Sequence, residues 1–468
     1  MSVKGFKNHP YIPNSVPEVE DAMLKEIGVA SLEDLHAEVP DEIILKDLMN
    51  IPPAFGSEYE LARHVKGLLK KNSSCEDNLN FLGAGCYQHY VPAICDEING
   101  KGEFLTAYGG ESYNDFGRFQ ALFEFESLVA ELVDMEVVNV PTMDYAQAAA
   151  TAISMGGRIS QRPVVLVPAM MDPEKRAVIQ NYCEPVLSIQ TVEADPATGC
   201  LDLADLKAKL NDTVGVVYIE NPCYLGMFEM NAKEIAEAAH AAGAQVVCGC
   251  DPISLGVVAP PRSFGADIVC GDVQPLGIHM NYGGGQSGFM ATMDDPKYVM
   301  EFPSRLFGIC RTIEDGEYAF ADVAYDRTSF GHLRDQAKEY VGTQSALWGI
   351  TAGVYLATMG PKGMQEVGET ILQNAQFAAK ILAQIPEVSL KYTTPFFEEF
   401  VLDFNKTGKT VEEINKALLA KHIFGGKDLS KEFPALGQCA MYCVTEVHTK
   451  EDIYTLRKAL AEVLAEVL

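Results

Sequence analysis

The chain contains several short runs of consecutive apolar residues, and segments with a helical pattern separate them. A strand that is apolar at every position must be buried on both faces, since a strand with one solvated face alternates between apolar and polar residues. Buried strands joined by helices predict an α/β fold with a mostly parallel sheet covered by helices on both faces. The runs are residues 164–167, 214–219, 245–248, 268–270 and 288–291.

At 468 residues the chain is long enough for more than one domain. Residues 1–70 are acidic and helical in pattern, and they are expected to form an N-terminal arm that packs on another surface. Residues 71–330 hold the apolar runs and are expected to form the large α/β domain. Residues 331–468 combine helical patterns with strand candidates at 400–404 and 441–444, which predicts a smaller C-terminal α+β domain.

Two helix starts are predicted within the arm. Ser57 precedes Glu60 by three residues, and Ser15 precedes Glu18 by three, which is the spacing of a capping box. Pro17 is typical of the first turn of a helix. We therefore expect helices to begin after both serines.

The charge balance and the cysteine pattern narrow the classes of partner. With 65 acidic and 36 basic side chains, a net charge of −29 repels nucleic acid and anionic membranes, so neither is expected as a partner. No signal peptide and no run of about 18 apolar residues is evident, so no membrane span is expected. The 12 cysteines have neither a disulfide framework nor metal-ligand spacing, which favours thiols in a cytoplasmic protein and no metal site.

Asp251 is the strongest candidate for a functional carboxylate. It follows an apolar run, and ligands of parallel sheets bind beyond the carboxyl ends of the strands. A carboxylate there is costly to bury without a partner. The alternative role is the N-cap of the segment that follows.

Loop residues supply weaker candidates. The glycines at 283–285 could cradle a phosphate or turn the chain. Gly342 and Thr343 precede a helix and could bind an anion or cap that helix. His89 and His279 lie near glycine and tyrosine residues, where a histidine can stack on a ring, transfer a proton or have a structural role.

No lysine occurs between Lys233 and Lys297, although this stretch has the features of a pyridoxal-phosphate (PLP) site. In PLP enzymes an aspartate holds the pyridine nitrogen, and a lysine forms the Schiff base. Asp251 can supply the first group, but the stretch contains no lysine to supply the second. We therefore do not expect a self-sufficient PLP enzyme.

Five motifs carry a resemblance that covers nearly the whole chain. Residues 81–92 read Phe-Leu-Gly-Ala-Gly-Cys-Tyr-Gln-His-Tyr-Val-Pro, and residues 104–108 read Phe-Leu-Thr-Ala-Tyr. Residues 9–13, 251–256 and 271–277 are similar again. With these motifs the chain resembles subunit 1, the alpha subunit, of the two-subunit glycine dehydrogenase (decarboxylating), the P-protein of the glycine cleavage system.

The resemblance implies a PLP type I fold whose Schiff-base lysine comes from a partner beta subunit. Residues 274–276 would occupy the place of that subunit's His-Lys pair. Glycine would condense with PLP and lose CO2, and the aminomethyl group would pass to the lipoyl arm of the H-protein. The implied catalytic residues are His89 and Tyr108, and the implied cofactor-binding residues are Asp251, Gln274, His279, Gly342 and Thr343.

Departures from the family pattern leave three alternatives. The stretches 109–117 and 337–344 differ from the family's polar sequences, and the turn at Asp144 and Tyr145, which receives a phosphate in related cofactor sites, lacks the usual glycine. The alternatives are a paralogous subunit that acts on another amino acid, a self-contained PLP enzyme that uses a lysine such as Lys338, and a non-catalytic scaffold or regulatory subunit.

Overall fold

The computed structural model describes residues 11–45, 49–105, 116–281, 284–323 and 344–465. The chain divides into two compact units, Met1–Ser73 and Ser74–Leu468. The boundary expected near residue 330 lies outside the described residues.

The first unit contains the helices α1 (Pro17–Ile27) and α2 (Glu58–Leu69). Ser57 caps α2 as expected, because its side chain accepts a hydrogen bond from the Glu60 amide at 3.2 Å. The prediction that Ser15 caps α1 was wrong, since the N-cap is Val16 and Ser15 ends a 3-10 turn, Pro13–Ser15. Pro17 explains the difference, because a proline keeps the preceding residue extended and so sets the helix start.

The second unit is built on a seven-stranded sheet in the order β2-β8-β7-β6-β5-β3-β4. Strands β4, β3, β5, β6 and β7 run parallel, whereas β8 is antiparallel to β7 and to β2. The strands are β2 (Val137–Val138), β3 (Val164–Pro168), β4 (Ser188–Val192), β5 (Val214–Glu220), β6 (Gln245–Cys250), β7 (Ile268–Asp272) and β8 (Gly288–Thr292).

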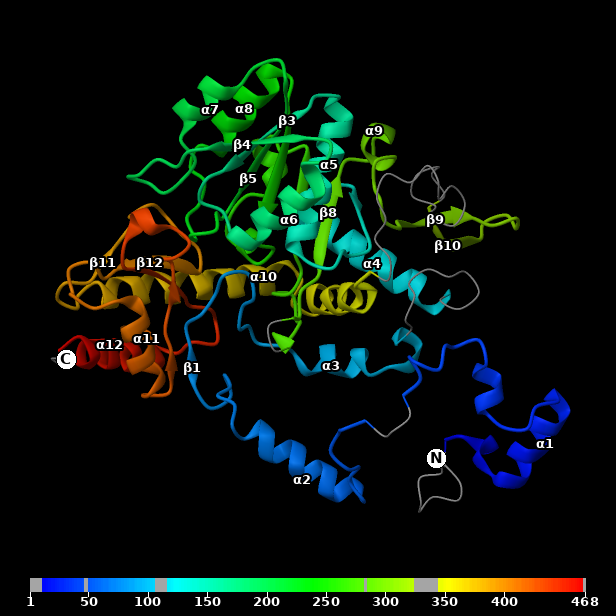
Figure 1. The fold of residues 1–468 in the computed structure, drawn as a ribbon. Coiled ribbons are helices and arrows are strands. Elements are labelled where there is room, and N and C mark those ends of the chain that lie inside the picture. The colour runs from blue at the N-terminus through cyan, green and yellow to red at the C-terminus, as the bar shows by residue number, and fades with distance from the viewer. Residues whose placement is uncertain (1–10, 46–48, 106–115, 282–283, 324–343, 466–468) are drawn as a thin grey trace. The chain divides into compact units, whose positions relative to one another are not determined.

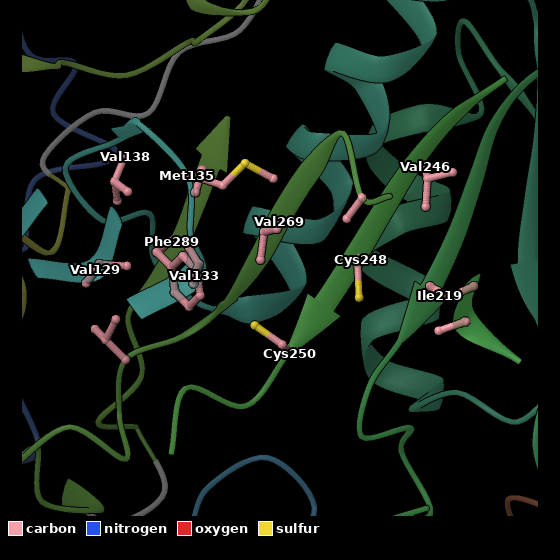
Figure 2. Close-up of a cluster of buried hydrophobic side chains, with 14 of the residues drawn as sticks. Val129, Val133, Met135, Val138, Ile219, Val246, Cys248, Cys250, Val269 and Phe289 are labelled. Atoms are coloured by element: carbon pink, nitrogen blue, oxygen red, sulfur yellow. The ribbon is translucent and has the colours of Figure 1, made fainter. Parts of the chain in front are cut away.

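Helices cover both faces of this sheet. Strand β6 shows why: Val246, Cys248 and Cys250 belong to one buried cluster, and Val247 between them belongs to another. Figure 2 shows the first cluster, to which Val129 of α4 also belongs. Helices α4 (Phe116–Val133), α8 (Ala232–Ala242) and the first half of α10 (Ala346–Leu382) contribute to this cluster, and α5 (Tyr145–Ser160) and α6 (Pro173–Cys183) contribute to the other.

A smaller antiparallel sheet, in the order β11-β12-β15-β14, follows in the C-terminal part of the chain. Its strands are β11 (Ser389–Leu390), β12 (Glu399–Asp403), β14 (Lys427–Asp428) and β15 (Cys439–Cys443). Helices α11 (Val411–Leu419), α12 (Lys450–Ala465) and the second half of α10 pack on it. Helix α10 therefore reaches both sheets, and it bends at Gly360, where φ is 59° and Pro361 follows (Figure 1).

Short elements complete the described fold. Strand β1 (Leu79–Asn80) pairs with β13 (Ile423–Phe424), and β9 (Phe307–Arg311) forms a hairpin with β10 (Tyr318–Asp322). The remaining helices are α3 (Ala93–Asn99), α7 (Leu203–Lys209) and α9 (Pro296–Val299). No helix among the described ranges is both long and apolar enough to cross a membrane.

The α/β architecture expected from the apolar runs is confirmed, since all five runs lie in strands of the large sheet. Strand β4 was not expected, because it lies at the sheet edge and its residues alternate between exposed and half-buried. An edge strand does not need the continuous apolar pattern of the central strands.

Phe289 in β8 is fully buried, so replacing it tests the packing of the large sheet. We expect Phe289→Ala to lower the free energy of unfolding by about 3–5 kcal/mol, because it leaves a cavity in the core. Urea unfolding followed by circular dichroism measures the change. The control is Ile313→Ala, at a fully exposed site, which should change stability by about 0.5 kcal/mol or less. Equal effects of the two substitutions would contradict the described packing.

Candidate active site

A cavity of about 200 Å³ opens at the carboxyl ends of three neighbouring parallel strands. Glu220 is the last residue of β5, Asp251 follows β6, and Asp272 is the last residue of β7. Figure 2 shows Cys250, the residue before Asp251, at the end of β6. This is the place where parallel sheets bind ligands. We refer to this cavity as the acidic pocket, because eight of its lining side chains are Asp or Glu.

Asp251 both lines the acidic pocket and contacts the turn that follows it. Its Oδ1 accepts a hydrogen bond from the Ile253 amide at 2.7 Å, which stabilises this turn, but the N-cap of the 3-10 helix Ser254–Gly256 is Ile253 and not Asp251. Its Oδ2 is buried, and no N–H or hydroxyl group of the described residues donates to it. Burial raises the pKa of Asp251, and the nearby His89 opposes that effect.

Glu398, just before β12, faces the same cluster and was not expected from the sequence. It is 3% exposed, and its Oε2 receives no donor from the described residues. Burial, then the negative charge of Asp251, raises the pKa of Glu398 well above its usual value. Burial and the neighbouring charge therefore favour the protonated form of Glu398, whose proton can lie between it and Asp251.

His89 lies beside these carboxyl groups in the second unit. Its Nδ1 is 2.9 Å from Glu446 Oε2, and its Nε2 is 3.8 Å from Glu398 Oε2. The side chain is only 1% exposed and does not line the acidic pocket. The structure thus brings His89 near Asp251, with Glu446 as its hydrogen-bond partner.

Glu399 is a second buried acid that sequence patterns did not single out. It accepts hydrogen bonds from the Ala84 amide at 2.6 Å and from the Tyr87 hydroxyl at 3.2 Å. Burial raises the pKa of Glu399 to about 7 despite these two bonds. The segment 81–92 is therefore held against the start of β12.

The acidic pocket contains a lysine that lies far from the stretch where a Schiff-base lysine was sought. Lys175 of α6 places its Nζ 2.7 Å from Glu220 Oε1 and 3.5 Å from the centroid of the Tyr145 ring. The Tyr218 hydroxyl donates to the same Glu220 oxygen at 2.7 Å. An ion pair and a cation–π contact both favour the charged ammonium, which is not a nucleophile.

Carboxylates of the chain itself occupy the N-terminus of α5. Asp144 caps the helix by accepting from the Gln147 amide at 2.7 Å, and Asp272 Oδ2 accepts from the Tyr145 amide at 3.0 Å. Asp272 Oδ1 accepts from two further amides, those of Gln274 and Ser287. Burial still raises the pKa of Asp272 to about 6. Two of the amides in the first turn of this helix, those of Tyr145 and Gln147, therefore already have carboxylate acceptors.

Gln274 and His279 are not placed in the acidic pocket. Gln274 accepts from the Tyr87 amide and donates to the carbonyl oxygens of Tyr87 and Ile278, each at 2.9 Å. His279 is about half exposed and pairs with Asp96 at 3.0 Å. Gln274 therefore ties the end of β7 to segment 81–92, and His279 lies on the surface.

The remaining candidates from the sequence are only partly visible. A Cβ at Gly285 would lie 2.1 Å from the His279 carbonyl oxygen, so this glycine permits a close turn. The structure describes only Gly284 and Gly285 of the glycines at 283–285. Tyr108, Lys338, Gly342 and Thr343 lie outside the described residues.

The fold and the acidic pocket can be compared with known proteins. Residues 9–460 match the family model described as glycine cleavage system P-protein. The chain belongs to this family. Similar proteins of Staphylothermus marinus and Pyrococcus furiosus, each named probable glycine dehydrogenase (decarboxylating) subunit 1, are 36% and 39% identical to it. These matches span 98% and 97% of this chain and 99% of each relative.

Solved structures agree with the family and the fold. A glycine decarboxylase (P-protein) of the glycine cleavage system, in inhibitor-bound form, is 33% identical with a TM-score of 0.86, over 98% of this chain and 100% of that one. A sphingosine-1-phosphate lyase of Burkholderia pseudomallei has a TM-score of 0.64 at 13% identity, over 89% and 92%, which shows the fold alone. The PLP-dependent type I fold is confirmed, and PLP is the cofactor of this fold family.

The acidic pocket suits only one part of PLP. Asp251 Oδ2 lacks a donor, as would suit a pyridine nitrogen that carries a proton. The phosphate does not fit, because the N-terminus of α5 is taken by Asp144 and Asp272, whose charges repel an anion. The described residues therefore do not form a complete PLP site within this chain.

The isolated chain can be tested for a reaction between PLP and a lysine of the acidic pocket. After incubation with PLP and reduction with borohydride, we expect no lysine of the acidic pocket to carry the cofactor, since Lys175 is ion-paired. Peptide mass spectrometry locates any adduct. Lys175→Met is the control that separates pocket labelling from labelling of surface lysines. A stoichiometric adduct at Lys175 would contradict this reading of the pocket.

The raised pKa of Glu399 gives a second test. Its folded pKa is about 7 and its ordinary value is 4.5, so its contribution to stability is present below pH 4.5 and is lost as the pH rises to 7. Because glutamine can keep both contacts, Glu399→Gln should gain up to about 3 kcal/mol relative to wild type over this range. Chemical unfolding at a series of pH values measures the difference. The exposed variant Glu387→Gln should show no such trend, and a flat difference for Glu399→Gln would refute the assignment.

Proposed function

We propose that this chain is the alpha-type subunit of a two-subunit PLP-dependent glycine decarboxylase. In this proposal a beta-type partner supplies the Schiff-base lysine and binds PLP, which serves as the electron sink for the loss of CO2 from glycine. The remaining aminomethyl group passes to the lipoyl arm of the H-protein. Full-length similarity to proteins named subunit 1 supports this division of labour.

One observation carries the proposal. Gln274 lies two residues after β7, where the resemblance places the partner's lysine, and three hydrogen bonds tie its side chain to the protein. The nearest lysine of the acidic pocket, Lys175, is held by Glu220. Both observations favour a Schiff-base lysine that comes from another chain and not from this one.

The proposal assigns this subunit a supporting role at the partner's site. Within it, Gln274 holds segment 81–92, Asp251 holds the turn after β6, and His89 is oriented by Glu446. Proton transfer by His89 or Tyr108 stays a prediction. The cofactor contacts of His279, Gly342 and Thr343 stay predictions as well.

A scaffold or regulatory subunit is the second candidate. The observation that favours it is at the N-terminus of α5, where Asp144 and Asp272 accept two of the backbone amides that could otherwise bind a phosphate. The third candidate is a paralogous enzyme that acts on another amino acid. The stretches 109–117 and 337–344 favour it, because they differ from the family's polar sequences.

The test uses the chain co-purified with a beta-type subunit and supplied with PLP and lipoyl H-protein. We expect exchange of labelled bicarbonate into the carboxyl group of glycine by the complex, and none by this chain alone. Borohydride reduction should trap PLP on a lysine of the partner. Alanine and serine in place of glycine are the controls for substrate.

Two outcomes would count against the proposal. Exchange by the partner alone at the rate of the complex would favour the scaffold role. Exchange with another amino acid but not with glycine would favour the paralogue.

A further inference from the structure

The acidic pocket has a charge balance that does not suit an anionic ligand. Eight acidic side chains line it, and Lys175 is the single basic one among its described lining residues. That lysine already pairs with Glu220 at 2.7 Å. The acids around Asp251 therefore face one another without a nearby ammonium or guanidinium group in the pocket lining. Such an arrangement attracts a cation and repels an anion.

The N-terminus of α5, which borders the acidic pocket, also disfavours an anion. Asp144 and Asp272 accept hydrogen bonds from the amides of Gln147 and Tyr145. A phosphate at these two amides would have to displace both carboxylates and would meet their negative charge.

Two buried carboxyl oxygens of the pocket lack a hydrogen-bond donor. Asp251 Oδ2 and Glu398 Oε2 are buried, and no N–H or hydroxyl group of the described residues donates to them. Glu398 is 3% exposed and lines the pocket. A buried acceptor without a donor costs about 1–3 kcal/mol, and more when the group is charged. A single proton shared between the two carboxyl groups satisfies them only in part.

We propose that the acidic pocket binds a small organic cation, a primary ammonium compound, at Asp251 and Glu398. An ammonium group has three N–H donors and one positive charge, so it can serve both carboxyl groups at once. The cavity of about 200 Å³ limits the ligand to a short carbon skeleton. Val178, Pro222 and Phe397 give the pocket apolar walls for that skeleton. This site is independent of the proposed decarboxylase activity, because it uses no PLP and no partner lysine.

Simple amines and amino acids share this ammonium group, and the pocket discriminates between them. An amino acid also carries a carboxylate, which the surrounding acids repel. Lys175 offers little compensation, since Glu220 already neutralises it. We therefore expect methylammonium to bind more tightly than glycine.

Isothermal titration calorimetry on the full chain, alone and co-purified with the beta-type partner, tests the proposal. The probes are methylammonium chloride, glycine and inorganic phosphate, with sodium chloride at matched ionic strength as the reference. We expect methylammonium to bind, glycine to bind more weakly and phosphate not to bind. Glu398→Gln should weaken methylammonium binding by about ten- to a hundredfold, because an amide cannot give up a proton to become a charged acceptor for the ammonium group. The exposed variant Glu387→Gln should leave it unchanged.

A second variant, Asp251→Asn, tests the same site if Glu398→Gln does not fold. Asp251→Asn keeps an oxygen for the Ile253 amide and removes the charge, so it should weaken methylammonium binding as well. Thermal unfolding identifies a variant that has lost its fold. The proposal is overturned if methylammonium does not bind the wild-type chain, if both folded variants bind it as tightly as wild type does, or if phosphate binds in its place. Its result does not depend on bicarbonate exchange, so the two proposals can fail separately.

Discussion

Three neighbouring parallel strands end in carboxylates at the same edge of the sheet, and the local structure depends on how these charges are accommodated. Close carboxylates in a buried site repel one another and favour protonation. Each of the three carboxylates is stabilised by a different kind of contact. Glu220 pairs with Lys175, Asp272 accepts backbone amides, and a proton can lie between Asp251 and Glu398. The turn after β6, the start of α5 and the approach of β12 all follow from these contacts.

The small sheet completes the acidic pocket, because the residues at the start of β12 lie close to the large sheet. The Gly226 carbonyl accepts from the Phe397 amide at 3.1 Å, and a Cβ at Gly226 would lie 2.0 Å from the Glu399 carbonyl oxygen. Only a residue without a side chain permits this contact, and φ of +92° at Gly226 also favours glycine. Glu398 and Glu399 thereby reach the strand ends of a sheet to which they do not belong.

The family and the chemistry of the site are separate conclusions. The P-protein family and its type I fold are shown by similarity along the chain, whereas the fold itself hosts more than one activity. In this chain the helix end that could hold a phosphate carries acids, and the lysine in the pocket is neutralised. A subunit with this pocket is consistent with a role beside a partner that holds the cofactor.

By itself the sequence determined the α/β class, the central strands and the position of Asp251 at a strand end. These follow from local patterns, because a continuous apolar run specifies a buried strand wherever it occurs. The edge strand β4 and the start of α1 were missed, since partial exposure and a proline override the simple patterns.

Only the tertiary structure decided the content of the acidic pocket. Lys175 lies on a helix with no distinctive motif, and Glu398 and Glu399 lie at the start of a strand of another sheet. Their meeting with Glu220 and Asp251 arises from contacts between distant parts of the chain, which no local pattern records. Whether a buried carboxylate is charged depends on its neighbours in space, so the electrostatic character of the site appears only when the chain is folded.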